Sequence, residues 1–362
     1  MNYKKYNQIL FISILAVVIF IIVFCYVINP FGVFSEKAYF FNKNFPELRK
    51  QERLTKVLQF KKLQSINTIF LGSSRVDFSI SDKYYDNLTN QTSFNFAMQG
   101  SRFAEHKYLI EKAIREQPNL HTVIIGIDYD FYYLQGENDL SILKSYEKDD
   151  LNNYSSLLLS STALGSSFTT LFKSLNPSYQ KGFDITGVKR IFVNNKIDES
   201  FYKTINQYKT VGNDFKNAKP ELSNLADLVQ ELRNKNIKVI LYMQPAHSSM
   251  YEIIKQNGAL DSLYLFKKEL SKIQPFYDFY YPSVYSSEKI QPNMKYFFET
   301  SHCTFLVGEK ILDKICLGVG EYGVLVNSQN IDEVHKNFIK QLEVWEKKNP
   351  EWVQKIKDIR EG

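Results

Sequence analysis

The sequence predicts an α/β protein in which helices cover both faces of a mostly parallel sheet, giving three αβα layers. Three observations support this prediction. Continuous apolar runs such as residues 122–127 (TVIIGI) are typical of strands that are buried on both faces. Amphipathic stretches such as residues 103–117 separate these runs and have the apolar spacing of helices. The alternation of strand and helix is typical of a parallel sheet with crossover helices.

An N-terminal transmembrane helix is predicted before the α/β domain. Residues 9–28 carry no charge and are long enough to cross the bilayer core as a helix. Lys4 and Lys5 precede them, so the positive-inside rule places residues 1–8 in the cytoplasm. Because no small-residue cleavage site follows, we expect an uncleaved, single-pass anchor in the cytoplasmic membrane and an extracytoplasmic domain.

The other segments follow in chain order. Residues 29–65 have the pattern of a stalk or connecting helix. We expect residues 66–325 to form the α/β domain, interrupted at about 140–219 by an insertion that is too long to be a structureless loop. Residues 326–362 are charged and form a C-terminal helical segment. Within the domain we predict strands at 66–71, 92–98, 122–127, 237–243 and 276–280, and helices at 103–117, 221–235, 260–273 and 304–317.

Local signals mark the ends of several elements. The helix at 221–235 is entered after Pro220 and carries leucines at helical spacing. The strand at 237–243 is a buried apolar run that ends before Pro245. The helix at 304–317 ends at Gly318, the residue that most easily adopts the left-handed conformation of a helix C-terminus.

Composition limits the possible functions. With 362 residues, of which 44% are hydrophobic, the chain can bury a sizeable core. Its net charge of +6 is mild and contains no dense basic block, so we expect no nucleic-acid partner, whereas an anionic membrane or polysaccharide stays compatible. Of the three cysteines, Cys25 lies in the apolar segment. Cys303 and Cys316 flank a predicted helix and either form a disulfide or stay unpaired.

Two distant motifs carry the chemistry. Ser73 and Ser74 directly follow an apolar run, at the carboxyl end of a strand, where parallel sheets place their active sites. Far downstream, Glu299 stands three residues before His302. A serine is a weak nucleophile that needs a base, and an acid can orient that base and stabilise its protonated form. Each motif alone also fits a turn or a helix cap, but together they favour a triad of Ser74, His302 and Glu299.

Four short blocks lie at the boundaries of predicted elements: GSSR at 72–75, NFAMQG at 95–100, GIDYD at 126–130 and ETSH at 299–302. Their order and spacing resemble the SGNH, or GDSL-type, superfamily of hydrolases and acyltransferases. The resemblance covers roughly residues 66–320 outside the insertion. It implies a flavodoxin-like three-layer fold and acyl-enzyme chemistry. The Gly-Ser-Ser form is similar to a membrane-anchored subset that modifies teichoic acids with D-alanine or O-acetylates exported polysaccharides.

The resemblance implies a role for each matched residue. Ser74 falls on the nucleophile and His302 on the base, while Ser73 and Glu299 stand where the family has aspartates. The oxyanion hole would be formed by the backbone of Ser74 and Gly100 and by the third block, where Asp128 replaces an asparagine. A carboxylate donates no hydrogen bond unless it is protonated, so it opposes an oxyanion.

Several residues near these motifs have two interpretations. Arg75 is a candidate substrate contact or a brace for the active-site loop, and His247 is a weaker candidate substrate contact or a structural residue. Asp128 and Asp130 could hold a cation, or one of them could cap a helix or pair with Arg75. Glu299 and His302 with Cys303 could also ligate a metal, but no further ligand cluster is visible in the sequence, so we expect none.

We therefore expect an extracytoplasmic, serine-dependent acyltransferase or esterase that acts on a cell-surface polysaccharide or glycolipid through an acyl-enzyme on Ser74. No cofactor is implied, and the resemblance implies a membrane-bound acyl exporter or acyltransferase as partner. Two other classes stay open. One is a catalytically inactive glycan-binding or assembly module on a hydrolase scaffold, and the other is a metal-dependent phosphoesterase using Asp128 and Asp130.

Overall fold

The computed structural model describes residues 3–35, 38–43, 47–129, 140, 143–144, 146, 150–177, 196–211, 216 and 220–359. The chain divides into two compact units. The first, called the N-terminal unit, contains the described residues of Met1–Leu63 and Asp139–Phe192. The second, called the sheet unit, contains those of Gln64–Asn138 and Val193–Gly362.

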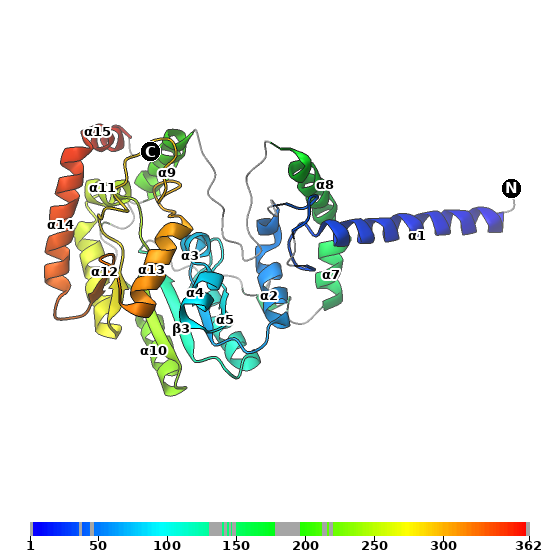
Figure 1. Ribbon diagram of the computed structural model, residues 1–362, viewed down its shortest axis with the longest axis horizontal. Coiled ribbons are helices and arrows are strands. Elements are labelled where there is room, and N and C mark those ends of the chain that lie inside the picture. Colours follow the sequence, from blue (N-terminus) through cyan, green and yellow to red (C-terminus); the bar gives the residue numbers. More distant parts are fainter. Residues whose placement is uncertain are drawn as a thin grey trace. The chain divides into compact units, whose positions relative to one another are not determined.

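The N-terminal unit contains one helix that is long and apolar enough to cross a membrane. This helix, α1 (Tyr3–Ile28), has a mean hydropathy of 3.2 over its most apolar window and is almost entirely exposed. It is accompanied by a 3-10 turn, η1 (Leu48–Gln51), and by α2 (Glu52–Lys62), α7 (Asp150–Leu158) and α8 (Ser161–Leu175) (Figure 1). The end of α1 packs into a small apolar core made of Cys25, Phe31, Val33, Leu54, Leu58, Leu157 and Ala163.

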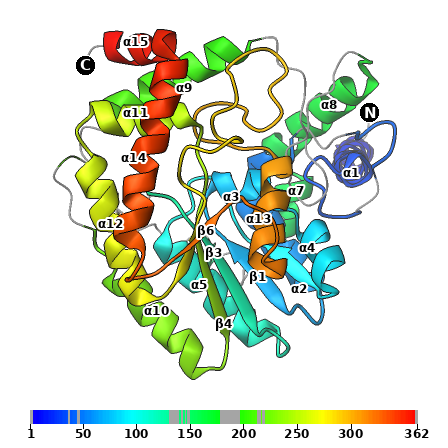
Figure 2. The same ribbon diagram turned by 60° about the vertical axis from the view of Figure 1, so that its left-hand side comes forward.

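The sheet unit is built on six strands among its described residues. In chain order these are β1 (Thr68–Leu71), β2 (Ser93–Asn95), β3 (Thr122–Ile127), β4 (Lys238–Met243), β5 (Phe276–Asp278) and β6 (Val324–Val326). Their order in the sheet is β2-β1-β3-β4-β5-β6. Figure 2 labels four of these strands, β1, β3, β4 and β6. The first five strands are parallel and β6 is antiparallel to β5. The α/β class and the mostly parallel sheet are therefore confirmed.

The strand lengths follow from local sequence. All six residues of β3 are buried, as its continuous apolar run predicts. The predicted strand at 92–98 is shorter, because the side chain of Asn95 accepts a hydrogen bond from the backbone N–H of Ala97 at 2.9 Å and turns the chain. Strand β6 was not predicted, since its three residues are too few to show a period and two of them are exposed.

Helices occupy most of the remaining sheet unit. Short helices α3 (Ser74–Ser79) and α4 (Asp82–Thr89) follow β1, where the sequence predicted little helix. Their serine N-caps explain them, since Ser73 accepts from the N–H of Arg75 and Ser81 from that of Tyr84. The others are α5 (Phe103–Glu116), α9 (Ile197–Val211), α10 (Ser223–Asn234), α11 (Ser248–Gln256), α12 (Leu260–Ile273), α13 (Phe305–Leu317), α14 (Ile331–Lys348) and α15 (Pro350–Asp358).

The expected insertion at about 140–219 does not form one body. Helices α7 and α8 belong to the N-terminal unit, whereas α9 belongs to the sheet unit. The ring of Phe201 on α9 contacts the ring of Trp352 on α15 at 6.3 Å between centroids. Trp345 and Trp352 of the C-terminal segment are both buried. All three cysteines are free thiols, so Cys303 and Cys316 form no disulfide.

Candidate active site

The order of the strands defines where a site is expected. Between β1 and β3 the sheet reverses its direction of growth, and ligands of open α/β sheets bind at the carboxyl ends of the strands beside such a switch point. Ser73 and Ser74 directly follow β1, and Asp128 directly follows β3. Backbone pairing of β1 with β3 therefore brings these two strand ends together.

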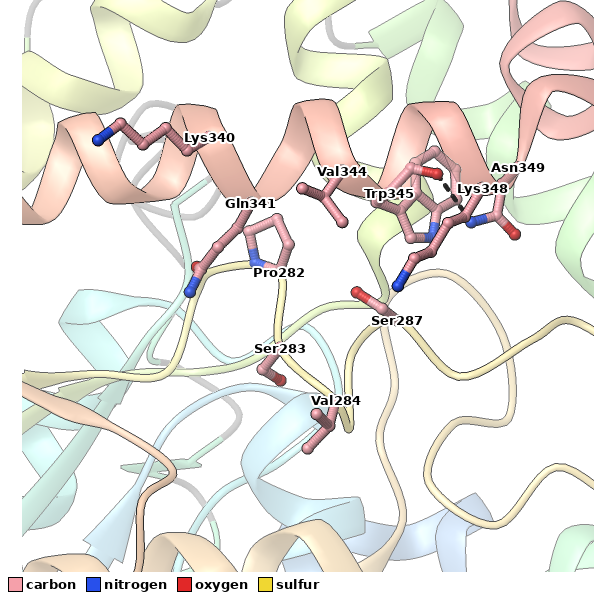
Figure 3. Close-up of a pocket in the computed structure, with 10 residues that line it drawn as sticks. All are labelled: Pro282, Ser283, Val284, Ser287, Lys340, Gln341, Val344, Trp345, Lys348 and Asn349. Atoms are coloured by element: carbon pink, nitrogen blue, oxygen red, sulfur yellow. Dashed lines mark hydrogen bonds between the residues drawn. The ribbon is translucent and has the colours of Figure 1, made fainter.

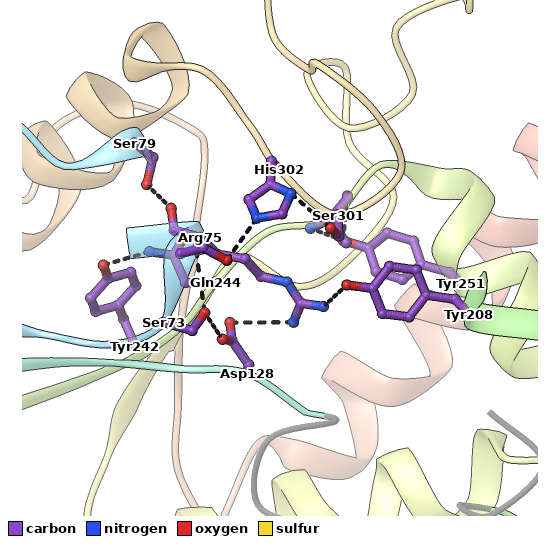
Figure 4. Close-up of polar contacts among 12 residues, drawn as sticks. Ser73, Arg75, Ser79, Asp128, Tyr208, Tyr242, Gln244, Tyr251, Ser301 and His302 are labelled. Atoms are coloured by element: carbon purple, nitrogen blue, oxygen red, sulfur yellow. Dashed lines mark hydrogen bonds and ion pairs between the residues drawn. The ribbon is translucent and has the colours of Figure 1, made fainter. Parts of the chain in front are cut away.

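Ser74 and His302 are in hydrogen-bond contact although 228 residues separate them. The distance between Ser74 Oγ and His302 Nε2 is 2.8 Å. The other ring nitrogen of His302, Nδ1, is bonded to Oε1 of Glu299. A proton on Nδ1 leaves Nε2 free to accept the proton of the serine hydroxyl. The predicted juxtaposition of serine, histidine and acid is therefore present (Figure 4 shows Ser301 and His302 in this site).

Ser301 orients the acid of this triad. Its hydroxyl and its backbone N–H each donate to a different carboxylate oxygen of Glu299, both at 2.9 Å. Burial by itself raises the pKa of Glu299, but the charge and hydrogen bond of His302, together with the bonds from Ser301, lower that pKa to about 2. Glu299 is therefore ionised at physiological pH and able to stabilise a protonated His302. Ser301 was not identified from the sequence, although it lies inside the motif.

The reacting pair lies at the edge of the buried region. Ser74 is partly exposed, and the side chain of His302 has an exposed fraction of 21%. The ring of Phe78, on α3, packs against the imidazole of His302 with 4.8 Å between centroids. This packing restricts the ring orientation of His302 while one side of the pair stays open to a substrate.

Arg75 and Asp128 form an ion pair beside the hydroxyl of Ser73 (Figure 4). Asp128 accepts a hydrogen bond from the hydroxyl of Ser73, and its other oxygen lies 3.3 Å from a guanidinium nitrogen of Arg75. Arg75 also donates to the hydroxyl of Tyr208 on α9 at 3.3 Å. Arg75 and Asp128 are only 3% and 4% exposed, which favours the bracing interpretation of Arg75 over its interpretation as a substrate contact.

The same contacts correct the prediction for Asp128. Its carboxylate accepts from Ser73 and pairs with Arg75, so it supplies no third donor to an oxyanion. The remaining candidate donors are backbone N–H groups. Within the described part of the chain, those of Ser74 and Gly100 donate to no protein acceptor. Gly100 is exposed and has a φ of +61°, a left-handed conformation that favours glycine.

Two glycines allow α3 to lie close against the sheet. A Cβ atom at Gly72 would lie 2.1 Å from a methyl group of Val76, and one at Gly126 would lie 2.3 Å from the same methyl group. His106, on α5, is fully buried. Burial lowers the pKa of His106 to about 4, so it is neutral. The sequence carried no signal for His106, because it lies on a helix far from the serine motif.

His247 has a structural role. It is completely buried, and its Nδ1 accepts from the backbone N–H of Ser249 at 3.2 Å, which caps α11. Its Nε2 lies 2.8 Å from the carbonyl oxygen of Glu288. Burial lowers the pKa of His247 to about 4. The burial and contacts of His247 therefore favour the structural interpretation over a substrate contact. Its backbone N–H donates to the carbonyl of Thr300 at 2.9 Å and so helps to position the loop that carries Glu299 and His302.

The described residues offer no group of three or more histidine, cysteine or acidic side chains that could hold a metal ion. Asp130, the proposed partner of Asp128 in a cation site, lies outside these residues. Cys303 is fully buried, and burial raises the pKa of its thiol to about 12.

A separate groove of about 520 Å³ lies between the loop around residue 284 and α14 (Figure 3). Val284, Val344 and Trp345 give it an apolar lining, and Lys340 and Lys348 stand at its rim. None of its lining residues comes from the predicted insertion at 140–219, and none is Ser74, His302 or Glu299.

Gly308 fixes the distance between α13 and α3. A Cβ atom at this position would lie 1.8 Å from the carbonyl oxygen of Ser79, so Gly308→Ala forces the backbone apart. We expect a loss of about 1–3 kcal/mol in the free energy of unfolding. Gly165→Ala on α8 is the matched control, because nothing lies within 4 Å of its Cβ position. Urea denaturation followed by circular dichroism tests both, and equal stability of the two variants would contradict the expected crowding.

The fold and the site together define an α/β protein with a Ser-His-Glu arrangement at the switch point of its sheet. Comparison of the chain with protein-family models, with curated proteins and with solved structures found no match in any of the three.

Proposed function

We propose that this protein is a serine-dependent acyltransferase or ester hydrolase in which Ser74 is the nucleophile, His302 the general base and Glu299 the residue that orients the base. The observation that carries the proposal is the continuous chain of contacts from Ser74 Oγ through the His302 ring to Glu299. Such a chain is the arrangement by which a weak serine nucleophile is activated near neutral pH.

The reaction has two halves. Ser74 Oγ attacks the carbonyl carbon of an ester while His302 Nε2 takes the hydroxyl proton. The backbone N–H groups of Ser74 and Gly100 stabilise the oxyanion of the tetrahedral intermediate. The intermediate collapses to an acyl-Ser74 ester as the leaving alcohol takes the proton from His302. In the second half, His302 deprotonates an acceptor hydroxyl, or water, which attacks the acyl-enzyme and releases Ser74.

The resemblance to the SGNH superfamily supports the finer features of the proposal. These are the three-layer, flavodoxin-like arrangement of the sheet unit and the use of Gly100 in the oxyanion hole. The parallel strand order 2-1-3-4-5 agrees with this arrangement. By the same resemblance, α1 anchors the protein in the cytoplasmic membrane, and the sheet unit acts outside it on a cell-surface polysaccharide or glycolipid. A membrane-bound acyl exporter would supply the acyl group.

Turnover of a chromogenic short-chain ester by the full-length protein tests the proposal. We expect turnover that a fluorophosphonate abolishes and that a chelator such as EDTA leaves unchanged. Loss of turnover with the chelator and resistance to the fluorophosphonate would instead support a metal-dependent phosphoesterase-like site.

A catalytically inactive glycan-binding module is the second candidate. The engagement of Asp128 by Ser73 and Arg75 favours it, because this leaves the site without the side-chain donor that the family supplies. Glycan binding that persists in a protein with no ester turnover would support this candidate and remove the first.

Glu299→Gln is expected to lower kcat by about 10³-fold, with little change in KM. An amide in place of the carboxylate carries no charge to stabilise protonated His302, and its NH2 group favours the wrong tautomer of the ring. Glu231→Gln, at an exposed position on α10, is the control. Steady-state kinetics of both variants give the answer, and equal kcat values would remove Glu299 from the mechanism.

A further inference from the structure

Helix α8 exposes large apolar side chains and buries small polar ones, the opposite of a helix that faces water. Phe168, Phe172 and Leu175 lie on one face, at positions i, i+4 and i+7, with exposed fractions of 43%, 69% and 54%. Helices of soluble proteins normally bury their large apolar side chains and expose the polar ones. The opposite face of α8 is buried and consists of small, mostly polar residues, namely Ala163, Ser166, Ser167, Thr170 and Ser174.

The buried face of α8 packs against the end of α1. The two helices are in contact, and Ala163 of α8 belongs to the same apolar core as Cys25 of α1. Small residues allow two helices to approach closely and are the type that packs helices together inside membranes. The inner face of α8 is therefore suited to pack on a transmembrane helix. Its outer face is exposed to whatever surrounds that transmembrane helix.

A row of aromatic rings continues from α1 onto α8. Phe20 and Phe24 of α1 have their ring centroids 6.1 Å apart, and Phe24 lies 4.9 Å from Phe168. Phe168 in turn lies 6.4 Å from Phe172. The apolar surface of α1 and the exposed apolar face of α8 therefore form one continuous surface.

The position of this row along α1 gives its depth. Phe24 lies four residues before the end of α1 at Ile28, which corresponds to about 6 Å at 1.5 Å per residue. Interfacial amphipathic helices insert their apolar face about 5–10 Å into the boundary of headgroups and acyl chains. Tyr26, whose ring contacts Phe34 at 5.1 Å, lies at the level where tyrosines form the interfacial belt of membrane proteins.

Charge on α8 does not oppose contact with lipid. Its one charged residue, Lys173, is paired with Glu47 at 2.8 Å. The helix carries no acidic residue, so anionic lipid headgroups meet no repulsion from it.

We propose that α8 is a second membrane contact, lying in the interface of the lipid bilayer on the side where α1 ends, with Phe168, Phe172 and Leu175 among the acyl chains. The proposal rests on the proposed membrane span of α1. A single transmembrane helix leaves the residues attached to it free to rotate about the helix axis. A second helix that lies in the interface restricts this rotation and fixes the orientation of the N-terminal unit relative to the bilayer.

Tryptophan quenching by brominated lipid tests this proposal on the full-length protein. Phe172→Trp, Leu15→Trp on α1 and Val284→Trp, an exposed position in the sheet unit, are reconstituted into phosphatidylcholine vesicles with and without 6,7-dibromophosphatidylcholine. The signal of the wild type, whose Trp345 and Trp352 are buried, is subtracted. We expect L15W and F172W to lose about half or more of their emission, and V284W to lose none.

Each other outcome overturns the proposal in a recognisable way. Quenching of L15W without quenching of F172W leaves the span of α1 intact and removes the interfacial role of α8. Failure of both probes to be quenched removes the span itself. Blue-shifted but unquenched emission from F172W indicates that protein, such as a second copy of this chain or another membrane protein, covers the helix in place of lipid.

Discussion

Ser74→Ala is expected to lower ester turnover by about 10⁴-fold or more, equivalent to a loss of about 5 kcal/mol in transition-state stabilisation. In the proposed mechanism the hydroxyl of Ser74 is the nucleophile, and we expect no neighbouring group to replace it. Ser73 lies next to it, but its hydroxyl donates to the buried Asp128 and accepts from the backbone of Arg75. Ser73, the N-cap of α3, is therefore turned toward Asp128. Ser74, the first residue of α3, contacts His302 instead.

The fold is expected to tolerate Ser74→Ala. The residue is partly exposed, so the free energy of unfolding changes by less than about 1 kcal/mol. Turnover of a chromogenic ester and the acyl content of the cell-surface polymer in cells carrying the variant measure the effect. Ser223→Ala, at an exposed serine on α10, is the control. Unchanged acylation of the surface polymer with the S74A protein would refute a catalytic role.

Asp128→Ala is expected to destabilise the sheet unit by about 3–5 kcal/mol. The side chains of Arg75 and Asp128 are each only 4% exposed, and the variant leaves a buried guanidinium without its carboxylate partner. The hydroxyl of Ser73 loses its acceptor in the same step. The cost arises from an uncompensated buried charge, so replacing both partners by apolar residues, Arg75→Met with Asp128→Leu, should recover much of the stability.

Urea denaturation followed by the fluorescence of the buried Trp345 and Trp352 measures this loss within the sheet unit. Glu199→Ala is the matched control, because its ion pair with Lys196 is highly exposed and contributes less than about 1 kcal/mol. A D128A protein as stable as E199A would show that the ion pair of Arg75 with Asp128 contributes little to the fold.

Strong patterns in the sequence were sufficient to predict the central elements. The fully apolar run of β3 and the amphipathic period of α12 predicted both elements at their observed bounds. Strand β6 and helices α3 and α4 were not predicted, since three to eight residues are too few for a periodic signal. The division of the insertion between two units could not be predicted either, because it depends on which surfaces its helices meet.

The candidate site was predicted only in part, for a similar reason. Ser74, His302 and Glu299 follow from residue types that activate a nucleophile, placed at element boundaries. The contact of Arg75 with Tyr208 joins the serine motif to a residue whose sequence surroundings carry no chemical motif. For Arg75 and His247 the sequence left a structural role and a substrate contact open, because it does not reveal burial, and both residues are buried.

Mapping the adduct of a fluorophosphonate by peptide mass spectrometry tests the central claim most directly. The account predicts one stoichiometric adduct on Ser74 of the native full-length protein, absent after denaturation and absent in the S74A protein. Labelling of Ser73 or of another serine, or no labelling of the native protein, would contradict it.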